Sequence, residues 1–167
     1  KLSLKEKAAL CSGGDDWNTK GIERLDINSF RFSDGPHGLR MPEDNRLKRI
    51  QHQDMQAVCF PEECLCAASF DCELLYQLGK TLGEECRARG IDMLLGPAIN
   101  IKRTPLCGRN FEYFSEDPYL TALLGAAYVE GVQSQVVGAC IKHFFANNQE
   151  SGRLESSSDL DERTEHE

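Results

Sequence analysis

The chain has 167 residues, of which 40% are hydrophobic and 28% charged, and this ordinary globular composition excludes a disordered, collagenous or coiled-coil protein. Its net charge of −8 removes the main attraction to nucleic acid. The longest uncharged apolar stretch, residues 120–129, is too short to span a bilayer, which takes about 20 residues. The length allows one folded domain but falls short of the roughly 250 residues of a complete eight-stranded β/α barrel.

Signals of export and of metal binding are missing from the sequence. No signal peptide opens the chain, and no Asn-x-Ser/Thr acceptor occurs. The eight cysteines form no Cys-x-x-Cys pair. We therefore expect a cytoplasmic protein whose thiols are reduced and act as small buried hydrophobic groups, with no metal or other cofactor and no membrane or nucleic-acid partner. The alternative is thiol or metal chemistry at Cys64 and Cys66.

The N-terminal third predicts a helix, a strand and an insertion. Ser3 and Glu6 have the spacing of a capping box and predict a short helix through about Cys11. Residues 27–32 predict a strand that runs into a Ser-Asp-Gly-Pro turn. Residues 41–56 are polar and without a clear period, which indicates an exposed insertion.

The remainder of the chain alternates helices with buried strands. Asp71 predicts the cap of a helix with a leucine stripe, which Gly90 ends. Residues 91–95 are a continuous apolar run typical of a strand buried on both faces. Asp117, followed by proline, predicts the start of a second helix, and residues 136–141 predict another buried strand.

Strand, helix, strand, helix and strand in this order predict an α/β fold with parallel strands and right-handed crossovers. The spacing of hydrophobic residues along the chain does not distinguish an open sheet from a barrel. Three polar motifs follow the predicted strands: Asp34, residues 100–109, and Lys142 with His143. Ligands bind at the carboxyl ends of the strands in both architectures, so these motifs are the candidates for function.

Asp34 and Arg109 each admit two interpretations. The turn Ser-Asp-Gly-Pro-His-Gly fixes the Asp34 carboxylate at the end of a strand, either toward a ligand or as an Asx-turn bonded to its own backbone. Arg109, beside a glycine, can present its planar guanidinium to oxygen acceptors or to Glu112. The alternative for Arg109 is an exposed ion pair of little energetic consequence.

Lys142 and His143 are the least ordinary pair in the sequence. An apolar strand seldom ends in two adjacent groups of this kind without partners, because their desolvation is costly. Such clustered donors and acceptors suit a ligand with many hydroxyl groups. The alternative is a strand end exposed to solvent. The sequence carries no dinucleotide, P-loop, Gly-x-Ser-x-Gly or His-Glu-x-x-His motif.

The ordered segments SDGPHG, LCGRNFEYFSEDP and IKHF, with SLKEKAALCSG near the start and DERT near the end, resemble glycoside hydrolase family 3, the β-glucosidase family. The resemblance runs from residue 1 to about residue 164. It implies a partial (truncated) TIM-type β/α barrel, with residues 1–167 as the N-terminal portion of the barrel domain and residues 151–167 as a solvated polar tail. The family's active site lies between this barrel and a C-terminal α/β sandwich.

The resemblance implies that the full-length protein is a retaining β-glucosidase that removes terminal non-reducing β-D-glucosyl residues from β-glucosides or oligosaccharides. Asp34 would bind the outer hydroxyls of the terminal sugar. Arg109, Lys142 and His143 would surround its ring hydroxyls, and Glu112 would orient Arg109 or Lys142. The resemblance also implies a cis peptide bond between Lys142 and His143.

No catalytic residue is expected within these 167 residues. The family's aspartate nucleophile lies in a Ser-Asp-Trp type motif further downstream, as does the general acid/base, and Trp17 belongs to a different motif. We therefore expect the isolated chain to supply sugar-binding residues without turnover. The alternative is a catalytically inactive sugar-binding or assembly fragment that self-associates or pairs with the missing C-terminal part.

Overall fold

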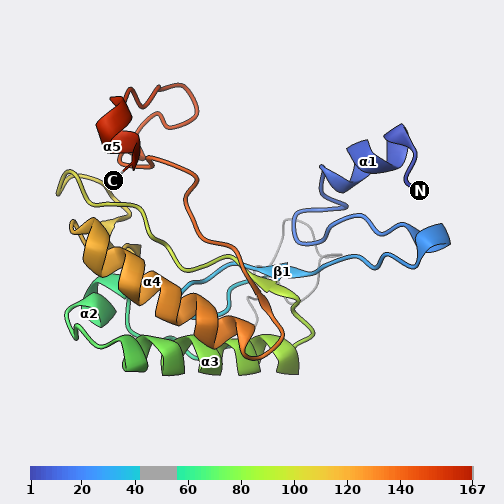
Figure 1. The fold of residues 1–167 in the computed structure, drawn as a ribbon, viewed down its shortest axis with the longest axis horizontal. Helices are drawn as coiled ribbons and strands as arrows, with labels where there is room; N and C mark the ends of the chain where they lie inside the picture. The colour runs from blue at the N-terminus through green and yellow to red at the C-terminus, as the bar shows by residue number, and fades with distance from the viewer. Residues whose placement is uncertain (42–55, 167) are drawn as a thin grey trace.

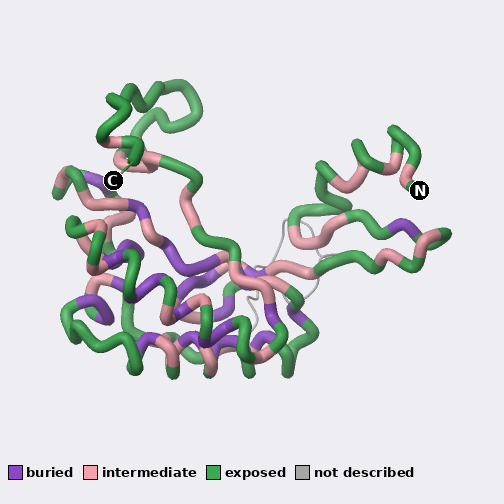
Figure 2. Tube along the Cα trace, in the orientation of Figure 1, coloured by how far each residue is buried: buried purple, intermediate pink, exposed green. Residues whose placement is uncertain are grey.

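A parallel sheet and two long helices form the centre of the structure. The computed structural model describes residues 1–41 and 56–166. Helices α3 (Cys72–Ala88) and α4 (Pro118–Gln133) lie side by side, and the segment that contains α1 (Leu4–Leu10) extends away from them (Figure 1). Buried positions gather on the two long helices and the strands (Figure 2). Within the described ranges, no helix combines the length and apolar character needed to cross a membrane.

The sheet contains three short strands in chain order. They are β1 (Phe32–Ser33), β2 (Met93–Leu94) and β3 (Gly138–Ala139), with β2 in the middle. Both neighbouring pairs are parallel, and Phe32 is the register partner of Met93. Helix α3 lies between β1 and β2 in the sequence, and α4 lies between β2 and β3. The predicted α/β fold with parallel strands and crossover helices is confirmed.

Local caps begin the helices where the sequence predicts. Ser3 Oγ accepts a hydrogen bond from the backbone N–H of Glu6, and Glu6 Oε2 accepts one from the backbone N–H of Ser3, which completes the capping box. Asp71 Oδ1 accepts from the N–H of Leu74 at 3.1 Å, and Asp117 Oδ1 caps α4 in the same way at 2.9 Å. Each cap satisfies a backbone donor that the helix itself leaves free.

Glycines allow α3 and α4 to approach at backbone distance. A Cβ atom on Gly79 of α3 would lie 2.2 Å from the carbonyl oxygen of Tyr128. A Cβ atom on Gly131 of α4 would lie 2.2 Å from the carbonyl oxygen of Tyr76. Neither position has room for a side chain. The close approach buries the Tyr128 ring completely.

Each strand is shorter than predicted. The expected strands 27–32, 91–95 and 136–141 contribute two residues each or fewer to the ladders, and β1 extends one residue beyond its predicted end. Part of the first segment pairs with earlier residues, because Ile27 forms an antiparallel bridge with Ile22 and Arg31 forms one with Asn18. Within this segment only Phe32 belongs to a strand of the parallel sheet.

Four short elements were not predicted. They are η1 (Glu23–Leu25), α2 (Glu63–Ala67), η2 (Asn110–Glu112) and α5 (Glu162–His166). One or two turns are too short to show a hydrophobic period. Helix α5 lies within the tail 151–167, so that tail is polar and exposed but not wholly irregular.

The expected insertion 41–56 falls almost entirely outside the described residues, which end at Met41 and resume at Gln56. Met41 itself is only 1% exposed and belongs to the hydrophobic core. An exposed insertion that begins at residue 41 is therefore wrong at its first residue.

The cysteines are all free thiols, but fewer are buried than expected. Cys66, Cys86 and Cys107 are buried, and burial raises the pKa of the Cys66 and Cys86 thiols to about 11 and about 12. Four are exposed: Cys11, Cys59, Cys72 and Cys140. The prediction of small buried hydrophobic groups is thus wrong for half of them.

Candidate functional site

The polar motifs that follow the three strands meet at one edge of the sheet. Asp34 comes directly after β1. Lys142, three residues beyond β3, forms a parallel bridge with Ala98, which lies beyond β2. The N–H of Ile99 donates to the carbonyl oxygen of Lys142 at 2.7 Å. Because the strands are parallel, their carboxyl ends share this edge, where ligands bind in α/β proteins.

A tight turn holds Asp34 in place. The N–H of Arg40 donates to the carbonyl oxygen of Asp34 at 2.8 Å, and the N–H of Gly38 donates to that of Gly35 at 3.1 Å. Gly35 has a φ of 101° and Gly38 a φ of 153°, values that side chains disfavour. A Cβ on Gly35 would lie 1.7 Å from the Gly38 carbonyl oxygen, so this turn requires glycine.

The Asp34 side chain bonds two cations. Its Oδ1 accepts from Lys142 Nζ at 2.6 Å, and its Oδ2 accepts from Arg40 Nη2 at 2.7 Å. Burial opposes ionisation of Asp34, but these two bonds outweigh it and lower the pKa of the carboxyl to about 2. An Asx-turn is therefore not the main role of this side chain, and Asp34 is a carboxylate at neutral pH.

Glu112 joins Lys142 to Arg109. The nearly buried Glu112 side chain accepts from Arg109 Nε, and its other oxygen lies 3.6 Å from Lys142 Nζ. The side chain of Arg109 is 23% exposed and that of Lys142 is 13% exposed. The alternatives of an exposed ion pair at Arg109 and a solvated strand end at Lys142 are therefore wrong. Glu112 was expected to orient Arg109 or Lys142, and it lies within ion-pair distance of both.

His143 lies beside this charged chain as a hydrogen-bonding group. Its Nδ1 lies 2.8 Å from the hydroxyl of Tyr113, and Asn147 Nδ2 donates to the same hydroxyl at 2.9 Å. Burial, Arg109 and Lys142 lower the pKa of His143, so the ring is neutral at pH 7. The peptide bond between Lys142 and His143 is cis, as predicted.

Several residues at this edge were not predicted to belong to the site. Arg40 and Lys142 both form ion pairs with Asp34. The only sequence signal for Arg40 was its position six residues after Asp34 in a glycine-rich turn. Glu150 accepts from Asn147 at 2.7 Å and from Arg153 at 3.0 Å, and Arg109 Nη1 lies 3.6 Å from it. The beginning of the tail thus contacts the site.

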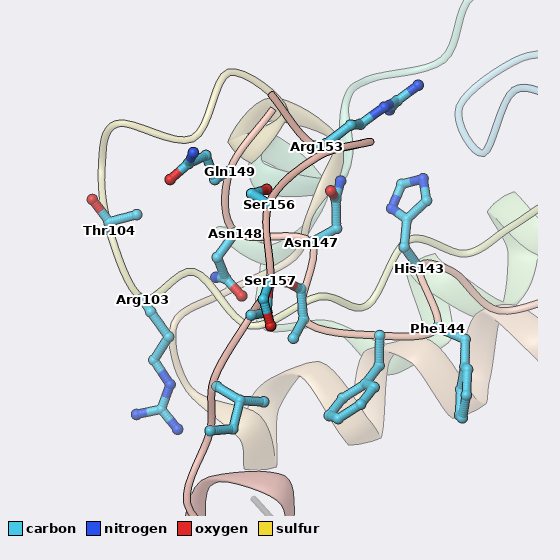
Figure 3. A pocket seen from close by; sticks show the side chains of 14 residues that line it. Arg103, Thr104, His143, Phe144, Asn147, Asn148, Gln149, Arg153, Ser156 and Ser157 are labelled. Atoms are coloured by element: carbon cyan, nitrogen blue, oxygen red, sulfur yellow. Dashed lines mark hydrogen bonds between the residues drawn. The ribbon is translucent and has the colours of Figure 1, made fainter. Parts of the chain in front are cut away.

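A cavity of about 590 Å³ opens beside His143. Figure 3 shows that the side chains of His143 and Asn147 stand next to each other, with Arg153 beyond them and Arg103 on the opposite side. Its wall also includes three consecutive serines, residues 156–158. The wall therefore combines neutral donors and acceptors with guanidinium groups.

The cluster provides hydrogen bonding of both kinds. Asp34 accepts hydrogen bonds, and Lys142 and Arg109 donate them. A neutral His143 ring donates from one nitrogen and accepts at the other. A hydroxyl group is both a donor and an acceptor, so a ligand with neighbouring hydroxyls matches this arrangement. In the part of the chain that the structure describes, no three His, Cys, Asp or Glu side chains are grouped to hold a metal ion.

Known proteins are similar to this chain in sequence. Thermostable β-glucosidase B of Acetivibrio thermocellus is 54% identical over 164 residues, which are 98% of this chain and 22% of that protein. The exo-α-(1→6)-L-arabinopyranosidase of Bifidobacterium longum is 47% identical over 154 residues, or 92% of this chain and 20% of that protein. The chain thus spans about a fifth of the length of these relatives.

Solved structures agree with the sequence relatives. The GH3 β-glucosidase of Bifidobacterium adolescentis superimposes with a TM-score of 0.87 at 44% identity, over 99% of this chain and 23% of that one. The β-glucosidase 3B of Thermotoga neapolitana, in complex with α-D-glucose, gives 0.76 at 42% identity, over 89% and 22%. The model of the family described as "Glycosyl hydrolase family 3 N terminal domain" matches residues 43–166, so the chain belongs to glycosyl hydrolase family 3.

Proposed function

We propose that the protein carrying this chain is a retaining β-glucosidase that releases terminal non-reducing β-D-glucosyl residues. This chain supplies the subsite for the terminal sugar. The observation that carries the proposal is the continuous chain of charged contacts from Asp34 through Lys142 and Glu112 to Arg109. It lies at the carboxyl edge of the strands, with neutral His143 beside it.

Each residue has a role that follows from its contacts. Asp34 and Lys142 bind hydroxyls of the sugar as a preoriented acceptor and donor, and Arg109 and His143 bind further ring hydroxyls. Glu112 touches Arg109 and Lys142 and orients them. Such contacts accelerate glycoside cleavage only where they strengthen as the sugar approaches its oxocarbenium-like transition state.

The described carboxylates at the site are engaged with cations, as Asp34, Glu112 and Glu150 show. We assign neither the nucleophile nor the acid/base to them, since retaining hydrolysis needs two carboxyl groups that face the scissile bond. Both groups are expected outside these residues. The isolated 167-residue chain is accordingly proposed to be inactive.

Hydrolysis of aryl glycosides by the full-length protein tests the function. We expect turnover of an aryl β-D-glucoside, and Lys142→Met is expected to reduce kcat/KM by at least about 100-fold. Lys5→Met, on the exposed face of α1, is the matched control and retains activity. An aryl α-L-arabinopyranoside is assayed in parallel, because one relative carries that name. Absence of turnover on the glucoside contradicts the proposal.

A second candidate function is that of an assembly piece that needs a further polypeptide. Among the described residues β3 pairs with β2 alone, and Phe144 and Val136 near it are fully or largely exposed. Unpaired strand edges and exposed apolar groups favour association. Mixing the chain with the remainder of the protein and assaying glucoside hydrolysis distinguishes this function, which predicts activity only in the mixture.

The cytoplasm is the compartment that we propose. The exposed free thiols support it, because they persist in a reducing environment. The net charge of −8 supports the absence of a nucleic-acid partner. Cell fractionation with an antibody against the protein tests the compartment, and recovery from the culture medium would contradict it.

A further inference from the structure

The turn that carries Asp34 has a second attachment through a buried acid. His37 Nδ1 lies 3.2 Å from Oε2 of Glu63, the first residue of α2. The Glu63 side chain is 2% exposed, and within the described ranges its Oε1 has no hydrogen-bond partner. A buried carboxylate costs free energy unless it is paired. The hydrogen bond with His37 therefore offsets part of the cost of burying the Glu63 carboxyl.

His37 joins three parts of the site. Its ring packs edge-on against Phe111 of η2, with centroids 6.1 Å apart and planes at 77°. The next residue of η2 is Glu112, which bonds Arg109. The backbone carbonyl oxygen of His37 accepts a hydrogen bond from the N–H of Phe60 at 2.7 Å. His37 therefore connects the Asp34 turn to α2 on one side and to the support of Glu112 on the other.

Charge strengthens this attachment. The hydrogen bond to Glu63 raises the pKa of His37, burial acts in the opposite direction, and the carboxyls of Glu62 and Glu112 also favour a protonated ring. Burial raises the pKa of Glu63, which the bond from His37 opposes. Below the pKa of His37 the bond is charge-assisted, and such bonds are roughly twice as strong as neutral ones.

We propose that Glu63 is a positioning residue that, through His37, fixes the 34–40 turn against η2 and so sets the approach of Asp34 to Lys142. Its effect on catalysis rests on the proposed function. Its effect on the turn does not, because the attachment is a property of the fold. Glu63 touches neither Asp34 nor Lys142 in the contacts described, so it acts through His37.

Amide hydrogen exchange and steady-state kinetics of the full-length protein test the proposal together. Glu63→Gln keeps the size of the side chain and removes its charge. We expect exchange in peptides covering residues 33–41 to rise by about 10-fold or more, while peptides within α3 stay protected. We expect KM for the aryl β-D-glucoside to rise by about 10-fold with kcat changed less, because the loss falls on sugar binding.

Glu84→Gln is the matched control, because it makes the same change at an exposed position of α3, away from His37. It should leave exchange and KM as in the wild type. If Glu63→Gln does not fold, His37→Phe removes the same hydrogen bond while keeping an aromatic ring beside Phe111, and is measured in its place.

The outcomes separate the two proposals. Unchanged exchange in residues 33–41 overturns the positioning role, and so does an equal rise in the turn and in α3, which would assign Glu63 to general stability. If the wild-type protein hydrolyses no glycoside, the proposed function fails while the exchange result still decides whether Glu63 holds the turn.

Discussion

Lys142 Nζ lies 2.6 Å from Oδ1 of Asp34, although 108 positions separate the two residues along the chain. Asp34 follows β1 and Lys142 follows β3, with β2 between them. Their contact therefore spans the whole width of the described sheet. A substitution at either residue therefore removes the ion-pair partner of the other.

Replacing Asp34 by asparagine should reduce kcat/KM for an aryl β-D-glucoside by about 100-fold, which is about 2.7 kcal/mol of transition-state stabilisation. The neutral amide cannot offset the charges of Lys142 and Arg40, and it loses the strong acceptor for a sugar hydroxyl. Steady-state kinetics of the full-length protein measure the effect. Asp16→Asn, at an exposed position, should keep wild-type kinetics. Equal values for both variants would remove Asp34 from the site.

The Asp34 pair should be insensitive to pH over the working range. Its lowered pKa means that the stabilisation is fully present above the ordinary value of 3.8 and is lost only as the pH falls toward about 2. The ratio of kcat/KM between wild type and Asp34→Asn should therefore stay constant from about pH 5 to 8. A ratio that declines steadily from pH 7 to 5 would show that the carboxyl titrates in that range and contradict the assignment.

Tyr128 of α4 should stabilise the turn that carries Asp34. Its hydroxyl, fully buried, donates to the carbonyl oxygen of Pro36 at 2.6 Å. Tyr128→Phe leaves that buried oxygen without its donor and should cost about 1–3 kcal/mol in the free energy of unfolding. Tyr119→Phe, at an exposed position of the same helix, is the control and should cost almost nothing. Urea denaturation compares the two, and equal midpoints would count against this contact.

Gly131→Ala should destabilise the protein although alanine is the better helix former by about 1 kcal/mol. The new methyl group would lie 2.2 Å from the carbonyl oxygen of Tyr76, so α3 and α4 must separate. We expect a loss of about 2–3 kcal/mol, near the upper end of overpacking effects. The methyl group of Gly125→Ala on the same helix would lie 3.2 Å from Ile99 Cγ2 and 3.9 Å from Phe114 Cε2, both side-chain atoms, and this substitution should cost about 1 kcal/mol or less. Thermal unfolding ranks the two, and the reverse order would refute the close approach.

Helices α1, α3 and α4 and the meeting of the site residues were predictable from the sequence because their signals are local or follow from topology. Ser3, Asp71 and Asp117 bond backbone groups two or three residues away, so their spacing alone reveals them. Parallel strands carry whatever follows them to one edge, which is why Asp34 and Lys142 could be placed together.

The remaining features depend on distances in space that no spacing in the sequence encodes. Arg40 reaches Asp34 only because two glycines close the turn between them. Glu150, just before the predicted polar tail, lies near Arg109 although 41 positions separate them in the sequence. Glu63 is a charged residue in an element too short to show a period, so its burial could not be foreseen.

The order of the strands has a consequence for folding during synthesis. In the described sheet β2 pairs with β1 and β3 pairs with β2, so each of these two strands finds its partner already synthesised as it leaves the ribosome. The ion pairs described at the site join residues between Asp34 and Arg153. These charges can therefore neutralise one another once residue 153 has been synthesised.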